Sequence, residues 1–414
     1  MQDPKPREET SSEAPRAARR RALVLLALAE LLGMSPWFSA SAVVPALAAE
    51  WNLGDGEISW LTLAVQIGFV AGTLTSAVLN LPDVLNARRL FAASALLGAA
   101  SNVAFATAAT GATSGIALRF ATGFFLAGVY PPGMKIMATW FRRGRGMALG
   151  VLVGALTLGK ASPYLINALE GPGWRARLLL VAAVAAAGGL IVLFLVADGP
   201  HTPPAAPFDI HQVAAVFRNR GVRLANFGYF GHMWELYAMW TWAPVFLRAS
   251  LALRGGDPAL AEMASFLVLG AGAAGCAAGG VLADRIGRTA VAGGAMAVSA
   301  ACCLAVGFLY GAPPGILLAV AILWGASVVA DSPQFSASVT ELSDPRYMGT
   351  ALTVQTCAGF LITTISIRMI PALLPETGWK FAFAFLAPGP ILGLLAMRRL
   401  RALPEASRLA QGRR

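Results

Sequence analysis

Twelve long apolar stretches constrain the fold of this chain more than any other feature. Each holds about 20 residues or more, the length that an α-helix needs to cross the roughly 30 Å hydrocarbon core of a bilayer. Only 13% of the 414 residues are charged, whereas soluble domains have about 25%. The sequence therefore predicts an all-α membrane protein. Its twelve spans are expected at 22–48, 58–80, 88–109, 112–138, 145–168, 176–197, 222–249, 259–283, 289–310, 315–340, 347–371 and 379–398.

Basic residues are distributed unevenly between the two sides of these spans. On one side they cluster in the segments 19–21, 88–89, 142–145, 218–223, 285–288 and 398–401. On the other side the clear basic residues are Arg175, Arg177, Arg248, Arg254 and Lys380. Because cytoplasmic segments are enriched in Lys and Arg, we expect a multi-pass protein of the bacterial inner membrane with both termini in the cytoplasm. The net charge of +11 then reflects topology and indicates no nucleic-acid partner.

A polar segment divides the spans into two sets of six. Residues 198–221 are rich in proline and charge, which marks a linker. Three features recur in both halves at an offset of 201–203: Trp37 with Trp240, the segment 145–150 with 348–353, and Asp83 with Asp284. Repeated six-span halves are one design of secondary transporters. The predicted regions of this monomer are a cytoplasmic tail (1–21), a first bundle (22–198), a cytoplasmic linker (199–221), a second bundle (222–400) and a second cytoplasmic tail (401–414).

The loop between spans 8 and 9 carries the sequence GGVLADRIGR (279–288). It resembles the loop signature of the major facilitator superfamily. The matching gate residues are Gly280, Asp284, Arg285, Gly287 and Arg288, and the corresponding loop of the first half keeps Asp83 and Arg88. The resemblance implies a cytoplasmic gate, in which these charges bridge to the end of a neighbouring helix and favour the outward-open state.

Two further segments support this resemblance, which covers roughly residues 20–400. RFATGFFLAG in span 4, with Arg119, is similar to the second motif of the superfamily. The glycines of GVLVGALTLGKASP (150–163) in span 5 are similar to its antiporter motif. The family resemblance implies two pseudo-symmetric six-helix bundles that transport by alternating access. TWFRRGRGMALG (139–150) and the chain length also resemble nitrate/nitrite-, cyanate- and oxalate-type porters, although the arginines and the Gly-Asn signature of nitrate porters are absent.

Six ionisable side chains are placed at membrane depth, where charge is costly and usually functional. They are Glu30, Arg119, Lys160, His232, Glu235 and Asp331. His232 and Glu235 are three residues apart on one helix and therefore neighbours. We expect them to share a proton near the middle of the membrane, or to bind substrate. The alternative is that both only hydrogen-bond to neighbouring helices.

The other four ionisable residues have two interpretations each. Lys160 could attract an anionic substrate, or it could form an ion pair with Glu30 or Asp331. The two acids could in turn be ion or substrate ligands, and Pro333 would loosen the helix beside Asp331. Their alternative is an ion pair with Lys160 or Arg119. Arg119 is expected to act in structure or coupling, because the resemblance of its motif implies that role.

Aromatic residues gather on spans 1, 4, 7 and 10, which the family resemblance implies are the spans that line a central cavity. The candidates are Trp37, Phe38, Tyr130, Tyr237, Trp240 and Trp324. An aromatic cavity suits an organic molecule with an apolar or ring portion. The alternative is a belt of aromatic residues at the lipid interface.

The sequence offers no pattern of an enzyme or of a cofactor site. Two of its three histidines lie in the linker, and its four cysteines lack metal-like spacing. A phosphate-binding loop is also absent. We therefore expect a proton-coupled secondary transporter of a small organic solute, anionic or aromatic. The alternatives are a proton-driven multidrug efflux pump and, in another class, a non-transporting receptor or sensor.

Overall fold

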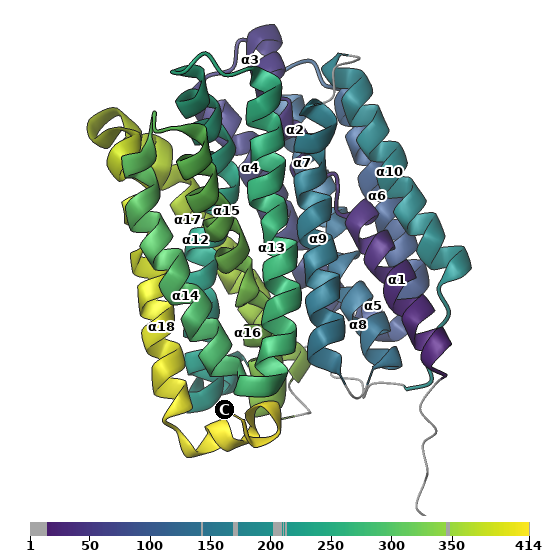
Figure 1. Ribbon diagram of the computed structural model, residues 1–414. Helices are drawn as coiled ribbons and strands as arrows, with labels where there is room; N and C mark the ends of the chain where they lie inside the picture. Colours follow the sequence, from purple (N-terminus) through teal and green to yellow (C-terminus); the bar gives the residue numbers. More distant parts are fainter. Residues whose placement is uncertain are drawn as a thin grey trace, which may run out of the picture.

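The computed structural model describes residues 15–141, 144–168, 173–201, 209, 211, 213–344 and 348–413, with the side chains at 55, 82, 83, 145 and 215 left undescribed. Within these ranges every regular element is a helix (Figure 1). The predicted N-terminal tail up to residue 14 and residues 202–208, 210 and 212 of the predicted linker lie outside the described residues. The all-α prediction is confirmed for the part of the chain that is described.

Ten of the helices among the described residues belong to the first half of the chain. They are α1 (Arg16–Gly33), α2 (Ser39–Ala42), α3 (Val44–Trp51), α4 (Asp55–Val78), α5 (Leu81–Val84), α6 (Ala87–Ala108), α7 (Ala112–Leu126), α8 (Tyr130–Trp140), α9 (Arg145–Ala168) and α10 (Trp174–Leu195).

The second half begins with the short helix α11. Its elements are α11 (Val213–Arg218), α12 (Arg220–Ala252), α13 (Pro258–Ile286), α14 (Arg288–Ala305), η2 (Val306–Leu309), α15 (Pro314–Ala330), α16 (Ser332–Leu342), α17 (Met348–Ala382), η4 (Phe383–Leu386), α18 (Pro388–Arg401) and η5 (Pro404–Gly412).

Nine helical stretches among the described residues are long and apolar enough to cross a membrane. The last, Met348–Arg401, is 54 residues long and bends at Gly378, where φ is +61°, so it holds two crossings. The first and seventh predicted spans are the broken run α1–α3 and the polar helix α12. Together these give the twelve crossings that the sequence predicts, with spans 11 and 12 separated at Gly378, where the backbone leaves the helical conformation.

Three of the crossings are interrupted in the middle of the bundle. The first lacks helical structure between Gly33 and Ser39, the fourth breaks between α7 and α8, and the tenth breaks at Asp331. Proline follows closely at the last two breaks, because its ring fits the first turn of the new helix. The second break, at Gly128, and Asp331 are 203 positions apart, which is the offset of the repeat.

Glycines let helices touch backbone to backbone at equivalent places in the two halves. A Cβ atom on Gly72 of α4 would lie 2.2 Å from the carbonyl oxygen of Phe124 of α7. A Cβ atom on Gly275 of α13 would lie 2.0 Å from the carbonyl oxygen of Ala326 of α15. These two glycines are also 203 positions apart, so the halves share this close helix contact as well as their breaks.

The two halves meet along a seam where α9 packs against α13 (Figure 1) and α4 packs against α17. α9 lies close to α13 because Gly154 would place a Cβ atom 3.0 Å from the carbonyl oxygen of Ala273. The seam positions side chains of both halves around one centre. The exact boundaries of the two bundles stay a prediction.

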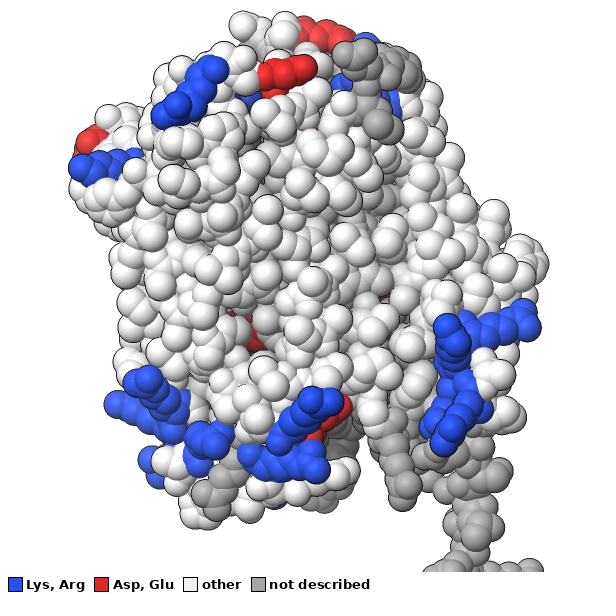
Figure 2. Space-filling model, viewed as in Figure 1, with Lys and Arg blue, Asp and Glu red and all other residues white. Residues whose placement is uncertain are grey.

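Lys and Arg side chains gather at one end of the bundle, which we call the basic end (Figure 2). It includes the start of α1 and the last turn of α18, with Arg398, Arg399 and Arg401. At the opposite end Arg175 contacts Glu50 at 2.5 Å and joins α10 to α3. Hydrogen bonds from Arg175 and Trp174 hold the pKa of the Glu50 carboxyl below its ordinary value.

Candidate functional site

Lys160 of α9 lies at the centre of the seam and is only 3% exposed. Its Nζ is 3.8 Å from the ring centroid of Trp37, 4.8 Å from that of Tyr237 and 5.4 Å from that of Trp240. It also donates a hydrogen bond to the hydroxyl of Tyr237. Because Tyr237 belongs to α12, this bond joins the two halves at the point where three aromatic faces surround one cation.

None of the described acidic residues lies within 4.0 Å of the Lys160 ammonium, so it has no ion-pair partner there. The predicted ion pair with Asp331 is not formed, because Asp331 contacts His232 instead. The charge of Glu30 does act on Lys160 from a greater distance. An ammonium in this position is stabilised chiefly by aromatic faces and one hydroxyl.

A cluster of aromatic rings closes the seam around Lys160. The Trp37 centroid is 5.1 Å from that of Phe69 and 5.7 Å from that of Phe360, and Phe69 and Phe360 are 4.6 Å apart. Phe38 meets Trp240 edge to face at 6.0 Å. Phe69 of α4 and Phe360 of α17 were not predicted from the sequence, because they stand in apolar spans where phenylalanine carries no distinguishing signal.

Several buried polar groups lack hydrogen-bond partners among the described residues. At this cluster they are the indole Nε1 atoms of Trp37 and Trp240, and on α4 they are both amide atoms of Gln66, three residues before Phe69. A buried polar group without a partner is costly. The indoles border Lys160, so the centre holds a cation and two unused N–H donors, which is the chemistry that an anion requires.

Glu30 of α1 is fully buried on the basic side of this centre. Neither of its carboxylate oxygens has a hydrogen-bond partner among the described residues. A Cβ atom on Gly133 would lie 2.5 Å from Oε2 of Glu30. The carboxylate can therefore pack against α8 only because residue 133 has no side chain. Tyr130 and Lys160 are close enough to interact with it electrostatically. An isolated carboxylate is far less costly in such a place when it carries a proton.

Arg119 of α7 supports the break in the first crossing. Its guanidinium donates to the carbonyl oxygen of Pro36 at 2.9 Å, to that of Trp37, and to the hydroxyl of Ser39 at 3.2 Å. Where a helix is interrupted, carbonyl oxygens lose their backbone N–H donors. The guanidinium N–H groups of Arg119 take the place of these donors. Arg119 thereby positions Trp37 beside Lys160. Its role in coupling stays a prediction.

Replacing Arg119 with leucine is expected to lower the free energy of unfolding by about 2 kcal/mol. The carbonyls of Pro36 and Trp37 would lose their donor, which costs about 1–3 kcal/mol each, while removal of a buried charge offsets part of the loss. The thermal midpoint in detergent measures the effect. Arg175→Leu is the matched control, because that pair is half exposed and contributes little. Equal midpoints for the two variants would contradict the supporting role.

The structure does not bring His232 and Glu235 together as a proton-sharing pair. His232 Nδ1 lies 2.8 Å from Asp331 Oδ1, at the break between α15 and α16. Side chains three positions apart on a helix diverge by about 60° around its axis, and this separation directs them to different neighbours. The histidine therefore pairs with an acid 99 positions away in the sequence, and the expectation of a shared proton within α12 is wrong for this geometry.

Glu235 is instead held by hydrogen-bond donors of the second half. Its Oε1 accepts from the Ser299 hydroxyl at 2.5 Å, the Trp324 indole at 2.5 Å and the Cys303 thiol at 3.0 Å. These bonds tie α12 to α14 and α15. Trp324 consequently lies against Glu235 and Phe383, away from the ring cluster around Lys160. This arrangement matches the alternative in which Glu235 joins helices.

The predicted gate residues lie at the basic end of the seam. The Asp284 carboxylate sits at the start of α9, with Oδ1 2.5 Å from where a Cβ atom of Gly146 would be. Gly287 has φ of +97° and lets the chain turn from α13 into α14. In the first half Arg88 pairs with Asp198 at 3.1 Å, whereas the Asp83 side chain lies outside the described part of the chain.

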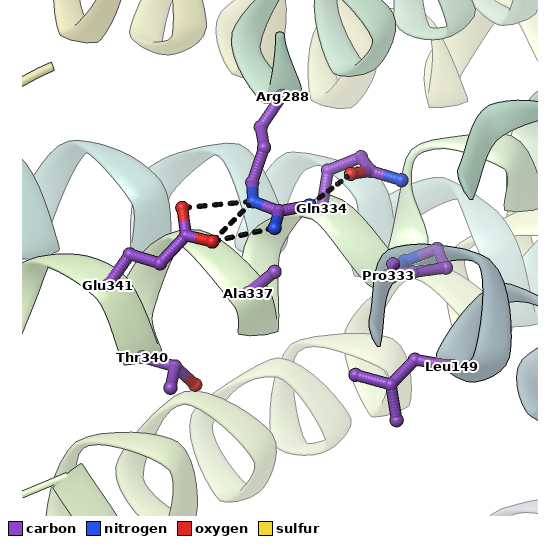
Figure 3. Close-up of a pocket in the computed structure, with 8 residues that line it drawn as sticks. Leu149, Arg288, Pro333, Gln334, Ala337, Thr340 and Glu341 are labelled. Atoms are coloured by element: carbon purple, nitrogen blue, oxygen red, sulfur yellow. Dashed lines mark hydrogen bonds and ion pairs between the residues drawn. The ribbon is translucent and has the colours of Figure 1, made fainter. Parts of the chain in front are cut away.

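Arg288 bonds to two side chains of this gate (Figure 3). It reaches from α14 to α16, where it meets Glu341 at 2.6 Å and the amide oxygen of Gln334 at 3.3 Å. The three side chains line a pocket that α9 completes with Gly146 and Leu149. This pocket lies between the halves and extends along α16 to Pro333, two residues from Asp331. Arg285, by contrast, is exposed.

The C-terminal segment adds contacts that were not predicted for a simple tail. The backbone N–H of Ala410 donates to Glu341 Oε2 at 2.9 Å. Arg413 donates to the carbonyl oxygen of Asp284. Leu409 is fully buried. The segment thus covers both acids of the second-half gate, and only its scattered apolar residues could have indicated this from the sequence.

Replacing Asp284 with asparagine is expected to weaken the closed arrangement at the basic end. A carboxylate at a helix N-terminus contributes about 1 kcal/mol through the helix dipole, so the populations of two states should shift several-fold. Spin-label distances between α9 and α13 at the basic end would measure the shift. Asp257→Asn, which removes an N-cap acid at the opposite end, should leave those distances unchanged. Identical distributions in Asp284→Asn and the parent protein would exclude a role for the Asp284 carboxylate in holding α13 to α9 at the basic end.

Twelve crossings in two similar halves, with a buried cation at their seam, define a multi-pass membrane protein of transporter architecture. The family model of the Major Facilitator Superfamily matches residues 26–367. The solved structure of the superfamily proton:xylose symporter XylE bound to 6-bromo-6-deoxy-D-glucose is similar in fold, with a TM-score of 0.74 and 14% identity over 92% of this chain and 96% of that chain. No curated protein sequence gives a significant match.

This chain belongs to the Major Facilitator Superfamily, as the extent of the family match shows. The membership confirms the predicted fold and identifies the protein as a secondary transporter rather than an enzyme. It also confirms an integral multi-pass location in a membrane. Resemblance to a particular group of anion porters stays a prediction.

Proposed function

We propose that the protein transports a small organic anion, with Lys160 as the group that binds the anionic charge. The observation that carries this proposal is a buried ammonium at the seam of the two halves, surrounded by three aromatic rings and without an ion-pair partner among the described acids. Charge at membrane depth is costly and marks a functional site. We place the basic end in the cytoplasm of a bacterial inner membrane, following the positive-inside rule.

The surroundings of Lys160 favour an anion that also has an apolar or ring portion. The indole N–H groups of Trp37 and Trp240 have no acceptor among the described residues, and a carboxylate supplies two. The rings of Phe69 and Phe360 offer faces against which an organic ring can stack. A carboxylate on an aromatic or compact apolar body satisfies both sets of groups.

Alternating access would have to break the contact between Lys160 and Tyr237. The two side chains belong to α9 and α12, on opposite sides of the seam, so rocking of the halves must separate them. A bound anion would take the place of the Tyr237 hydroxyl as the partner of the ammonium. In the empty protein, separation of the two halves would leave Lys160 without its hydrogen bond to Tyr237. A bound anion would replace this bond and so stabilise the separated arrangement.

Glu30 is the proton carrier that the geometry favours most. It is fully buried, has no hydrogen-bond donor among the described residues, and is the acid whose charge acts on Lys160. When an anion neutralises Lys160, a charged Glu30 loses its favourable neighbour and should take up a proton. Anion and proton would then bind together. The pair of His232 and Asp331 is a second group through which a proton could pass.

Transport by purified protein in liposomes tests the proposal and its direction. Benzoate, benzamide and benzylammonium form a matched series with one ring and a negative, neutral or positive group. We expect counterflow of the carboxylate and little or none of the other two. A preference for the cation would favour the drug-efflux alternative instead, and equal movement of all three would exclude Lys160 as the selective group. Comparing inward with outward pH gradients decides between uptake and efflux.

A further inference from the structure

A long apolar groove runs along the outer surface of the second half, away from the seam. α12 forms its floor, while α17 and α18 form its walls, since both pack on α12 but hardly touch each other. The lining residues are Leu224, Phe227, Phe230, Gly231, Trp234, Ile362, Ile365, Pro388, Gly389, Leu392, Leu395, Ala396 and Arg399. All but one of them are apolar or aromatic residues. The groove has a volume of about 650 Å³, enough for a hydrocarbon chain.

The groove has a definite inner end and a definite mouth. At the inner end Gly231 and Gly389 touch through their backbones, because a Cβ atom on Gly231 would lie 2.3 Å from the Gly389 carbonyl oxygen. Trp234 lies beside this crossing and donates its indole N–H to the carbonyl of Phe385 at 3.4 Å. At the mouth stands Arg399, in the last turn of α18 at the basic end.

The dimensions of the groove match one leaflet of a bilayer. Ten helical residues separate Gly389 from Arg399, which corresponds to about 15 Å. Half of the roughly 30 Å hydrocarbon core is the same length. A chain that enters from the basic end would therefore reach the glycine crossing at the bilayer middle, while its headgroup would lie at the level of Arg399.

Arg399 gives this site its preference for charge. It is exposed, and no described acidic residue forms an ion pair with it. Its neighbour Arg401 is engaged with Thr289 at 3.3 Å, and Arg223 of α12 donates to the carbonyl of Phe217. We propose that the groove binds an anionic glycerophospholipid, with one acyl chain between α17 and α18 and the phosphate on Arg399. This inference is independent of the substrate proposed above.

Quenching of Trp234 by brominated lipid tests the site. The full chain is reconstituted in phosphatidylcholine with brominated acyl chains, and unbrominated phosphatidylglycerol is titrated in. The contribution of Trp234 is the difference between the parent protein and Trp234→Phe. We expect phosphatidylglycerol to displace the brominated lipid about fivefold more effectively than phosphatidylcholine does, because one arginine near the surface contributes about that factor.

Two charge variants on one helix turn make the result decisive. Arg399→Gln should abolish the preference for phosphatidylglycerol, whereas Arg398→Gln, which lies outside the groove lining, should retain it. Soluble glycerol phosphate should not compete, since it lacks the acyl chain. An unchanged preference in Arg399→Gln would overturn the proposal. Failure of every brominated lipid to quench Trp234 would also overturn it, because protein, such as a second copy of the chain, would then cover the groove.

Discussion

Replacing Lys160 with methionine is expected to lower the affinity for the transported anion about 10- to 100-fold. A charge-assisted hydrogen bond contributes about 1.5–3 kcal/mol, and each 1.4 kcal/mol corresponds to about a tenfold change in affinity. Methionine has a similar length and fills irregular apolar space, so the ring cluster around position 160 should persist. Binding to purified protein, followed by the Trp fluorescence of Trp37 and Trp240 or by calorimetry, would measure the loss.

Two further variants separate a binding role from a structural one. Tyr237→Phe removes the hydrogen bond to Lys160 but keeps the charge of Lys160, and we expect no loss of affinity, because the hydroxyl that the anion must displace is absent. Thermal unfolding is the second measurement. Lys160→Met should be at least as stable as the parent protein, because a buried cation is removed. An unstable Lys160→Met that Glu30→Gln restores would show instead that Lys160 is a structural partner of Glu30.

Much of the architecture could be predicted because the bilayer leaves few solutions. A span must be helical and about 20 residues long, so apolar run length alone indicates twelve crossings. The proline after Asp331 also identified a loosened helix correctly. Boundaries were less predictable where backbone conformation decides them. The eleventh and twelfth crossings are two helices separated by a kink at Gly378, where φ is +61°, and hydropathy does not indicate that the residues on either side of this kink are helical.

The candidate site could be predicted by residue type but not by partner. The sequence predicted that Lys160, Glu30 and His232 lie inside the bundle, and all three are buried. Their depth in the membrane could be predicted because it follows from counting residues along a helix. Partners depend on rotation about each helix axis and on segments far away in the sequence. Asp331 is 99 positions from His232, and its approach depends on the break in the tenth crossing. Phe69 and Phe360 likewise meet only because α4 packs against α17.

The largest functional effect is expected from replacing Glu30 with glutamine. Glutamine has nearly the same shape as glutamic acid and fits beside Gly133, but it cannot take up or release a proton. Transport that depends on a proton gradient should therefore fall to the level without a gradient. Exchange of internal for external substrate should remain, since exchange moves no net proton. Proteoliposomes with an imposed pH gradient allow accumulation and counterflow to be compared on one preparation.

Glu235→Gln is the matched control, because it makes the same chemical change in a carboxylate of similar burial. Three donors hold Oε1 of Glu235, and a glutamine oxygen can accept from the same groups. We expect this variant to keep gradient-driven accumulation. The reverse result, with accumulation lost in Glu235→Gln and retained in Glu30→Gln, would move the proton to Glu235 and leave Glu30 as a buried neutral acid. Loss in both variants would require two carboxylates in one pathway, which α12 could connect through His232 and Asp331.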